Sequence, residues 1–226
     1  MGSGIFLRRT LCLAALVTTT AFSGPDHPDR VFSGYAEDEL RYFDEVAFRN
    51  DRLYRWRRPI ELSLTGKDPA LEPVLDLMIR DVRPLLGNLT IRKAEKGNLV
   101  IHQPHELAQY ASRYTLPGPL PLGYAVPQFA GTELTRVDIY IHPLLLPDKR
   151  EEVLRHELCH ALGLLQHATA LYAGQGLLSP PSVTREKRRP GQALLSRLDR
   201  AAIRLLYDAR LRPGLSRSDF RRKTGL

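Results

Sequence analysis

Two histidines flank a glutamate in one short segment, His156-Glu157-Leu158-Cys159-His160. On a helix, side chains four residues apart lie on the same face, about 6 Å apart, so both imidazoles can bind one zinc ion. Glu157 follows the first histidine and can reach a zinc-bound water as a general base. The spacing therefore predicts Zn2+-dependent hydrolysis, with His156 and His160 as metal ligands and Glu157 as the catalytic residue.

The alternative to a zinc site is a structural helix that carries the two histidines by chance. The surrounding segment, residues 153–165 (VLRHELCHALGLL), is mostly apolar. Burying two histidines and a glutamate there would be costly unless each had a polar partner. The zinc site is therefore the better explanation. Cys159 is expected to be an inert buried thiol, because cysteine is among the most often buried residues.

The segment continues through residues 161–167 (ALGLLQH), and the whole resembles the metzincin zinc-protease motif, H-E-x-x-H-x-x-G-x-x-H. In metzincins the glycine ends the helix in a sharp turn that brings a third histidine onto the metal. The resemblance implies that role for Gly163. It departs from the motif at the third histidine, which would fall at Gln166, whereas His167 stands one residue later.

Helix geometry says what this displacement means. In a helix that ran straight on, His167 would lie about 10 Å along the axis from His160, too far for a metal bond near 2 Å. His167 is therefore a metal ligand only if the helix breaks at Gly163 and the turn absorbs the extra residue. The alternatives are a carboxylate from Asp138 or Asp199, or a two-histidine site completed by water.

Metzincins also place a methionine turn beneath the metal, but this sequence contains only Met1 and Met78. Leu177 or Leu178 is the candidate for the floor of the site instead. Tyr172 is a candidate oxyanion donor, since a tyrosine near zinc can stabilise a tetrahedral intermediate. A packed loop aromatic is the more common role for such a tyrosine.

Hydrophobic periodicity predicts the elements that position these residues. Helices are expected over residues 37–52, 71–86, 148–165 and 194–207, and strands over 60–64, 89–92, 98–102 and 137–141. Residues 114–127, rich in proline and glycine, are expected to form a long irregular connection. This order predicts a single α+β domain, a small mixed sheet with an active-site helix and a C-terminal helix.

The ends of the chain have their own composition. Residues 1–23 combine two arginines, a short apolar run and small residues at a cleavage position, which predicts a signal peptide and a periplasmic or secreted protein. Residues 24–36 are expected to be an extended leader, and 37–212 the zincin-like domain. Residues 213–226 are expected to be a basic, frayed tail.

Net charge excludes one class of function. The 226-residue chain carries a formal charge of +8, but residues 185–226 hold 13 basic and 4 acidic residues, so the rest is nearly balanced. The basic end lacks interleaved aromatic residues and any nucleic-acid motif, so no specific nucleic-acid partner is expected. Weak contact of this end with an anionic envelope surface remains an alternative to a solvated end. A monomer is expected.

Beyond the zinc motif, residues 37–216 resemble the domain of unknown function 2927 family. The resemblance rests on Tyr42-Phe43, Val46-Ala47-Phe48, Arg55-Trp56, Asn98-Leu99-Val100, Leu198-Asp199, Leu205-Leu206-Tyr207-Asp208, Leu211 and Pro213-Gly214. It implies an exported, metzincin-like protein of Gram-negative bacteria with a zincin fold. The function expected is zinc-dependent peptide-bond hydrolysis, with a peptide or protein substrate extended along a sheet edge. The alternatives are an exported metal-binding or envelope-interaction module with little activity, and a hydrolase of cell-wall peptide.

Overall fold

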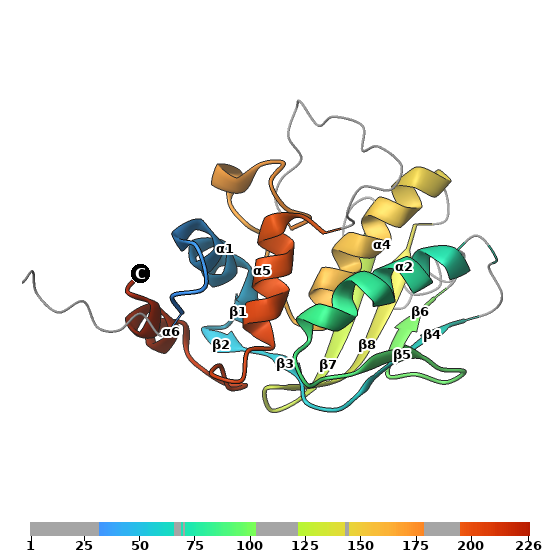
Figure 1. Ribbon diagram of the computed structural model, residues 1–226. Helices are drawn as coiled ribbons and strands as arrows, with labels where there is room; N and C mark the ends of the chain where they lie inside the picture. The colour runs from blue at the N-terminus through green and yellow to red at the C-terminus, as the bar shows by residue number, and fades with distance from the viewer. Residues whose placement is uncertain (1–31, 66–68, 70, 103–121, 143–144, 179–194) are drawn as a thin grey trace, which may run out of the picture.

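A mixed sheet forms the centre of the fold (Figure 1). The computed structural model describes residues 32–65, 69, 71–102, 122–142, 145–178 and 195–226. In spatial order the strands are β3 (Arg55–Trp56), β8 (Glu133–Ile141), β6 (Leu99–Ile101), β4 (Ile60–Leu64) and β5 (Ile91–Lys93), with β7 (Gly123–Ala130) paired to β8. The β7–β8 pair is antiparallel, whereas the other described pairs of this sheet are parallel. The prediction of an α+β protein with a small mixed sheet is confirmed.

Strand β7 is an edge strand of this sheet. It pairs with β8 along its whole length, from Gly123 opposite Ile141 to Ala130 opposite Glu133. The other side of β8 is taken by β3 and β6, which pair with different parts of it. Within the described residues, the outer edge of β7 therefore faces no further strand, and its backbone groups there can pair with another chain.

The helices lie in two groups (Figure 1). Their bounds are α1 (Glu37–Ala47), α2 (Glu72–Val82), α4 (Pro147–Leu162), α5 (Arg197–Leu206) and α6 (Arg217–Thr224), with short 3-10 turns η1 (Arg83–Leu85) and η2 (Ala170–Tyr172). Helices α2 and α4 lie along the sheet, while α1, α5 and α6 gather beside the small hairpin of β1 (Phe48–Arg49) and β2 (Arg52–Leu53). The predicted helices are confirmed in place, with shifted ends.

The first helix is shorter than the predicted span of 37–52. It ends at Ala47, and the chain then forms the β1–β2 hairpin. The hairpin turns on Asn50 and Asp51, which both have positive φ, of 49° and 60°. Asparagine and aspartate tolerate this left-handed conformation better than other non-glycine residues, and two such residues in a row form a tight hairpin turn.

The predicted irregular connection over residues 114–127 is wrong at its end, because residues 123–127 belong to strand β7. Residues 103–121 lie outside the described part of the chain. Pro127 obscured the strand, since proline lacks the N–H that a central strand needs. At an edge strand proline is tolerated where that N–H would point to solvent, so β7 accommodates it.

The predicted frayed tail over residues 213–226 is wrong, because α6 forms there. Phe220 on this helix is fully buried, with its ring centroid 5.0 Å from that of Phe43 and 5.5 Å from that of Phe48. The Arg221 guanidinium also donates a hydrogen bond of 2.7 Å to a carboxylate oxygen of Asp44. Hydrophobic periodicity does not predict this helix, because the helix is strongly polar and Phe220 is its single large apolar residue.

The expected extended leader, 24–36, is only partly described. Residues 24–31, like the predicted signal peptide 1–23, lie outside the described residues. Phe32 is buried, with its ring centroid 6.3 Å from that of Phe220, and the Tyr35 N–H donates to the Phe32 carbonyl in a turn. The leader prediction is therefore wrong from residue 32 onward, where the chain turns and joins the core.

Replacing Phe220 by alanine is expected to lower the free energy of unfolding by about 3–5 kcal/mol, because a large buried side chain is removed from a packed aromatic cluster. Urea denaturation measures this change. Arg222→Ala on the same helix is the matched control, since Arg222 is exposed, and it is expected to change stability by less than about 0.5 kcal/mol. Equal, small effects of both substitutions would mean that α6 is not part of the cooperative fold.

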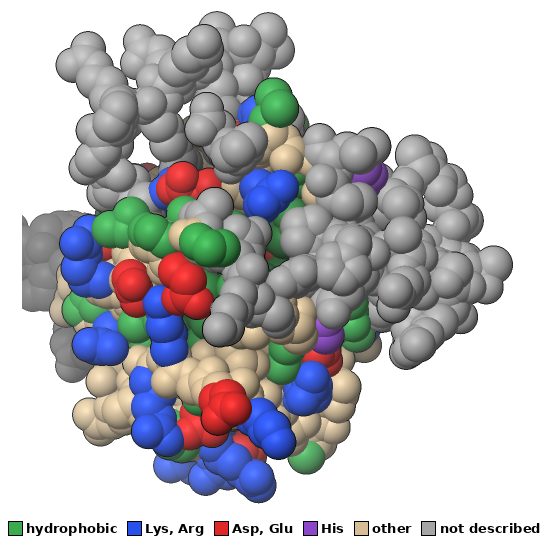
Figure 2. All heavy atoms as spheres, turned by 90° about the vertical axis from the view of Figure 1, so that its right-hand side faces the viewer, with side chains coloured by type: hydrophobic (Ala, Val, Ile, Leu, Met, Phe, Trp, Pro, Cys, Tyr) green, Lys and Arg blue, Asp and Glu red, His purple; other side chains and the backbone are tan. Residues whose placement is uncertain are grey.

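The surface of the described chain shows no concentration of one charge on the face drawn in Figure 2, where basic and acidic side chains are interspersed. None of the described helices has the length and apolar composition that crossing a membrane would need.

Candidate metal centre

Helix α4 brings the first two histidines together. Pro147 occupies its first turn, where a missing N–H costs nothing. His156 and His160 follow on one face, and their Nε2 atoms lie 3.1 Å apart. The apolar side of the same helix is in the core, where Leu154, Leu158 and Cys159 are buried.

Gly163 ends this helix. It adopts a φ of +115°, and its N–H donates to the His160 carbonyl at 2.9 Å, while the next N–H donates to the Cys159 carbonyl. The chain then turns toward α1, where the Gln166 N–H donates to the Val46 carbonyl at 3.0 Å. Because the helix breaks at Gly163, His167 returns to the face that carries His156 and His160.

The glycine is required by space as well as by conformation. A Cβ at Gly163 would lie 2.5 Å from the Tyr54 carbonyl oxygen. Gly163→Ala is therefore expected to lower the free energy of unfolding by at least about 2 kcal/mol, measured by urea denaturation of the metal-free protein.

Gly131→Ala is the matched control for this substitution. Gly131 also has a positive φ, of +61°, but a Cβ there would meet nothing within 4 Å. Only the conformational cost of about 1–2 kcal/mol then applies. Equal losses of unfolding free energy in Gly163→Ala and Gly131→Ala would show that the close approach of the Tyr54 carbonyl adds nothing to the cost at Gly163.

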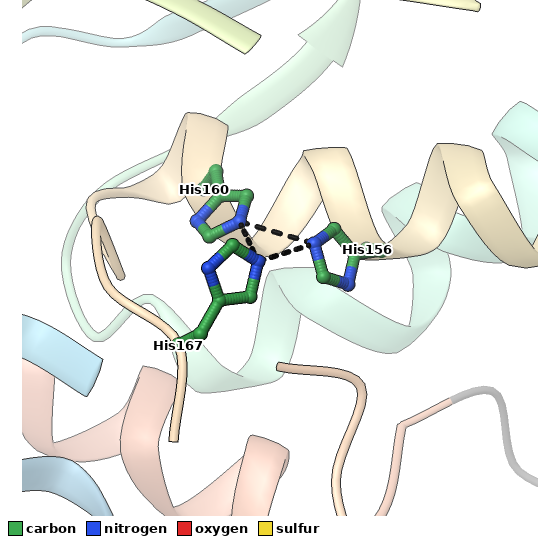
Figure 3. A group of neighbouring side chains, drawn as sticks. All are labelled: His156, His160 and His167. Atoms are coloured by element: carbon green, nitrogen blue, oxygen red, sulfur yellow. Dashed lines mark hydrogen bonds between the residues drawn. The ribbon is translucent and has the colours of Figure 1, made fainter. Parts of the chain in front are cut away.

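His167 completes a cluster of three histidines (Figure 3). Its Nε2 lies 3.0 Å from that of His156 and 3.3 Å from that of His160. The ring comes from the segment after the helix break and points its Nε2 toward the two helix residues. The extra residue is absorbed in the turn after Gly163.

The two carboxylates considered as alternative ligands lie elsewhere. Asp138 accepts hydrogen bonds from His102 and Arg136. Burial acts to raise the pKa of Asp138, but these hydrogen bonds lower it to about 2. Asp199 is buried and accepts from the Tyr42 hydroxyl at 2.9 Å. Within the described residues, neither belongs to the histidine cluster.

Hydrogen bonds to backbone carbonyls fix the proton positions of the two helix histidines. His156 Nδ1 lies 2.8 Å from the Leu177 carbonyl oxygen, and His160 Nδ1 lies 2.6 Å from that of Leu164. A carbonyl oxygen can only accept, so each Nδ1 carries the proton. In a neutral imidazole the Nε2 atom then presents a lone pair.

Burial keeps these rings neutral. It lowers the pKa of His156 and His167, and it lowers the pKa of His160 to about 3. The unprotonated Nε2 atoms of His156 and His160 therefore face each other across 3.1 Å with no proton between them. Such a contact is repulsive unless a cation binds both lone pairs.

The spacing of the three Nε2 atoms fits zinc. With zinc–nitrogen bonds of about 2.0–2.1 Å in a tetrahedron, two ligand nitrogens are separated by about 3.3 Å. The observed separations of 3.0–3.3 Å lie close to that value. Three imidazoles leave a fourth position open, as in catalytic zinc sites, and the carbonyls that hold the Nδ1 protons orient the rings.

Glu157 lies beside this cluster, within the same cleft. The residue is 6% exposed, and burial raises the pKa of its carboxyl group to about 7, although a backbone hydrogen bond from Ala125 acts in the opposite direction. A carboxylate with a pKa near 7 can accept a proton and release it again at neutral pH. The chemistry of a general base is therefore available at this position.

Strand β7 packs closely against Glu157. A Cβ at Gly123 would lie 2.9 Å from the Glu157 Cγ and 2.4 Å from a methyl carbon of Val153. Gly123 thus allows the edge strand to approach α4. This contact could not be predicted from the sequence, because Gly123 stands in a region rich in glycine and proline.

A cleft of about 590 Å³ runs between β7 and α4 past the histidines. It is lined by Arg49, Leu122, Gly123, Tyr124, Ala125, Pro127, Glu152, Val153, His156, Glu157, His160, Leu165, His167 and Leu177. Most of its described wall is apolar, and the polar groups converge at the histidine cluster. This composition is typical of a small-molecule or peptide site.

Tyr172 does not join the cluster. It is buried on η2, where its ring lies 5.3 Å from that of Tyr42 in an edge-to-face contact, and it is not among the residues that line the cleft. The oxyanion role considered for it has no support in this position. Leu177 lines the cleft, and its carbonyl oxygen accepts from His156 Nδ1.

The chain was compared with known proteins. The family model described as "Protein of unknown function (DUF2927)" matches residues 36–224, which contain the described helices and strands from α1 to α6. No curated protein matches the sequence. Because the family model covers most of the chain, including the histidine cluster, the protein belongs to the DUF2927 family of proteins of unknown function.

Proposed function

We propose that the protein is a zinc-dependent peptidase with a zincin-like site, in which His156, His160 and His167 hold the metal. The observation that carries this proposal is the convergence of three Nε2 atoms within 3.3 Å, two of them with Nδ1 fixed as the donor. The buried Glu157 in the same cleft adds a base of suitable pKa.

The metal and the residues around it would have different roles in peptide-bond hydrolysis. Zinc, when bound, supplies the Lewis acidity that polarises the scissile carbonyl and activates a water molecule. Glu157 takes the proton from the attacking water and passes it to the leaving amine. The carbonyls of Leu164 and Leu177 keep the imidazole rings oriented.

Strand β7 offers a place for the substrate. Its outer edge faces no strand within the described residues, and Gly123, Tyr124, Ala125 and Pro127 line the cleft. A peptide can add to such an edge by backbone hydrogen bonds while its side chains enter the cleft. An extended peptide or protein segment is therefore the substrate class that the cleft favours.

Export is part of this proposal. Residues 1–23 are proposed as a secretory signal, and the periplasm or the exterior as the place of action, with the protein working as a monomer. Cell-wall peptide is an alternative substrate for the same chemistry.

A metal-binding or envelope-interaction module with little hydrolytic activity is the second candidate. It is favoured by two departures from the metzincin motif. His167 stands one residue later than the third histidine of the motif, and no methionine turn is expected, since Met78 is buried on α2. A site of this kind would still bind zinc.

The test measures zinc content and peptide cleavage together on residues 24–226. One zinc per chain and cleavage of a peptide library that depends on Glu157 are expected. Zinc without Glu157-dependent cleavage would favour the binding module, and absence of zinc would remove both candidates.

A further inference from the structure

Arg49 lines the same cleft as the histidine cluster, although it belongs to a different part of the fold. It lies on β1, next to the turn of the β1–β2 hairpin. Arg49 has no role in the proposed hydrolysis. A cation at the wall of an otherwise mostly apolar cleft therefore needs a separate explanation.

The guanidinium of Arg49 is available to a ligand. Its side chain is exposed, and among the described residues no carboxylate forms an ion pair with it. Its one described contact is with the ring of Phe129 on β7, whose centroid lies 5.5 Å from the Arg49 Cζ. A cation over an aromatic face is held in place while its N–H donors stay free.

The backbone beneath Arg49 is firmly held. The adjoining turn is tight, and the C-terminal segment is bonded to the hairpin, because the Leu53 N–H donates to the Leu215 carbonyl and the Arg217 N–H to that of Asp51. Phe48, directly before Arg49, is buried. A side chain that projects from a fixed backbone loses less entropy on binding a ligand.

Strand β7 sets the position of Arg49 relative to the reacting centre. Ala125 on β7 makes a backbone hydrogen bond to Glu157, and Phe129, under Arg49, lies four residues further along the strand. At about 3.3 Å per residue this separation is about 13 Å. A peptide extended along β7 thus meets Arg49 about four residues from its scissile bond.

The opposite end of the cleft has a different character. Leu122 and Tyr124 are large apolar residues of the cleft wall that are 58% and 39% exposed, and Glu152 on α4 also lines the cleft. The cleft is therefore asymmetric, with its single described arginine at the Phe129 end. A ligand with a negative group at that end is electrostatically matched to it.

We propose that Arg49 is a specificity residue that binds a carboxylate of the peptide substrate, on the Phe129 side of the scissile bond. This inference rests on the proposed peptidase function. The planar guanidinium can take a carboxylate through two parallel hydrogen bonds. The carboxylate can come from an acidic side chain or from the free C-terminus of a peptide, which makes acidic peptides the substrate class.

The experiment uses binding, so that it does not depend on turnover. Fluorescein-labelled peptides, in which one glutamate is moved along a neutral chain, are titrated with zinc-loaded Glu157→Gln protein and followed by fluorescence anisotropy. Each peptide is paired with its glutamine and lysine versions, and with versions that have a free or an amidated C-terminus. Glutamate is expected to bind at least about 10-fold more tightly than glutamine at one position.

Substitutions of Arg49 in the same background identify the group responsible. Arg49→Gln is expected to abolish the preference for glutamate, and Arg49→Glu to reverse it in favour of lysine. Arg52→Gln is the matched control, since Arg52 is the cross-strand partner of Arg49 but donates to the Gly214 carbonyl and does not line the cleft. It is expected to keep the preference.

Each outcome decides the proposal. Equal binding of glutamate and glutamine peptides together with no effect of C-terminal amidation, equal loss in Arg49→Gln and Arg52→Gln, or no peptide binding at all would overturn it. A preference that only the C-terminal amide removes would assign the carboxylate to the chain end. Peptide cleavage by the wild type is scored separately, so a preference that depends on Arg49 without any cleavage would contradict the peptidase function and keep the binding role.

Discussion

Glu157→Gln is expected to lower kcat/KM for peptide hydrolysis by about 10²–10⁴-fold, which is the usual contribution of a general base. Glutamine keeps the size of the side chain but cannot accept the proton of the attacking water. The zinc content of the variant is expected to stay at that of the wild type, because Glu157 is not one of the three residues whose nitrogens converge. Cleavage of a quenched fluorescent peptide and metal analysis of the same sample measure the two quantities.

Glu37→Gln is the matched control for this result. Glu37 lies on the exposed first turn of α1, where it pairs with Arg41, and it does not line the cleft. The control is expected to retain full activity. Cleavage by Glu157→Gln at the wild-type rate would show that the observed hydrolysis belongs to a contaminant or that another group is the base.

His167→Ala is expected to weaken zinc binding by at least about 100-fold. The three histidines are the only described group of residues placed to hold a metal, so this substitution removes one of three nitrogen donors. This loss of zinc affinity is larger than the roughly 10–100-fold loss caused by altering residues that only orient a metal-binding side chain. Competition with a chromophoric chelator at neutral pH measures the change in affinity.

His142→Ala controls for the loss of a histidine as such. His142 follows β8 and does not line the cleft, so its replacement is expected to leave zinc affinity unchanged. If His167→Ala bound zinc as tightly as the wild type, the site would be a two-histidine site completed by water. Equal weakening by both variants would point to a general loss of the fold.

The sequence predicted the central part of the site because local spacing determines it. The four-residue interval between His156 and His160 places both rings on one face of any helix, whatever surrounds that helix. The position of His167 depended on how the chain leaves the helix. Periodicity predicted a helix through residue 165, and only the resemblance to metzincins implied a break at Gly163. The direction of the chain after the break is set by the bond from Gln166 to Val46 on a distant helix.

Other parts of the site have no signal in the sequence. The carbonyls of Leu164 and Leu177 hold the imidazoles, and a backbone carbonyl is the same group at every residue. Arg49 comes from a hairpin that the periodicity of α1 concealed, since its two strands have only two residues each. Contacts of this kind follow from tertiary packing, which a local pattern does not encode.

The closure of α6 over α1 has a consequence for the order in which the chain is made. Arg221 reaches Asp44 across 177 residues of sequence, and Phe220 packs against Phe43 and Phe48. A ribosome that has synthesised everything up to α5 therefore holds a chain whose first helix still exposes its aromatic face. The hairpin that carries Arg49 is bonded to the same late segment, so the cleft can take its final shape only after α6 has been synthesised.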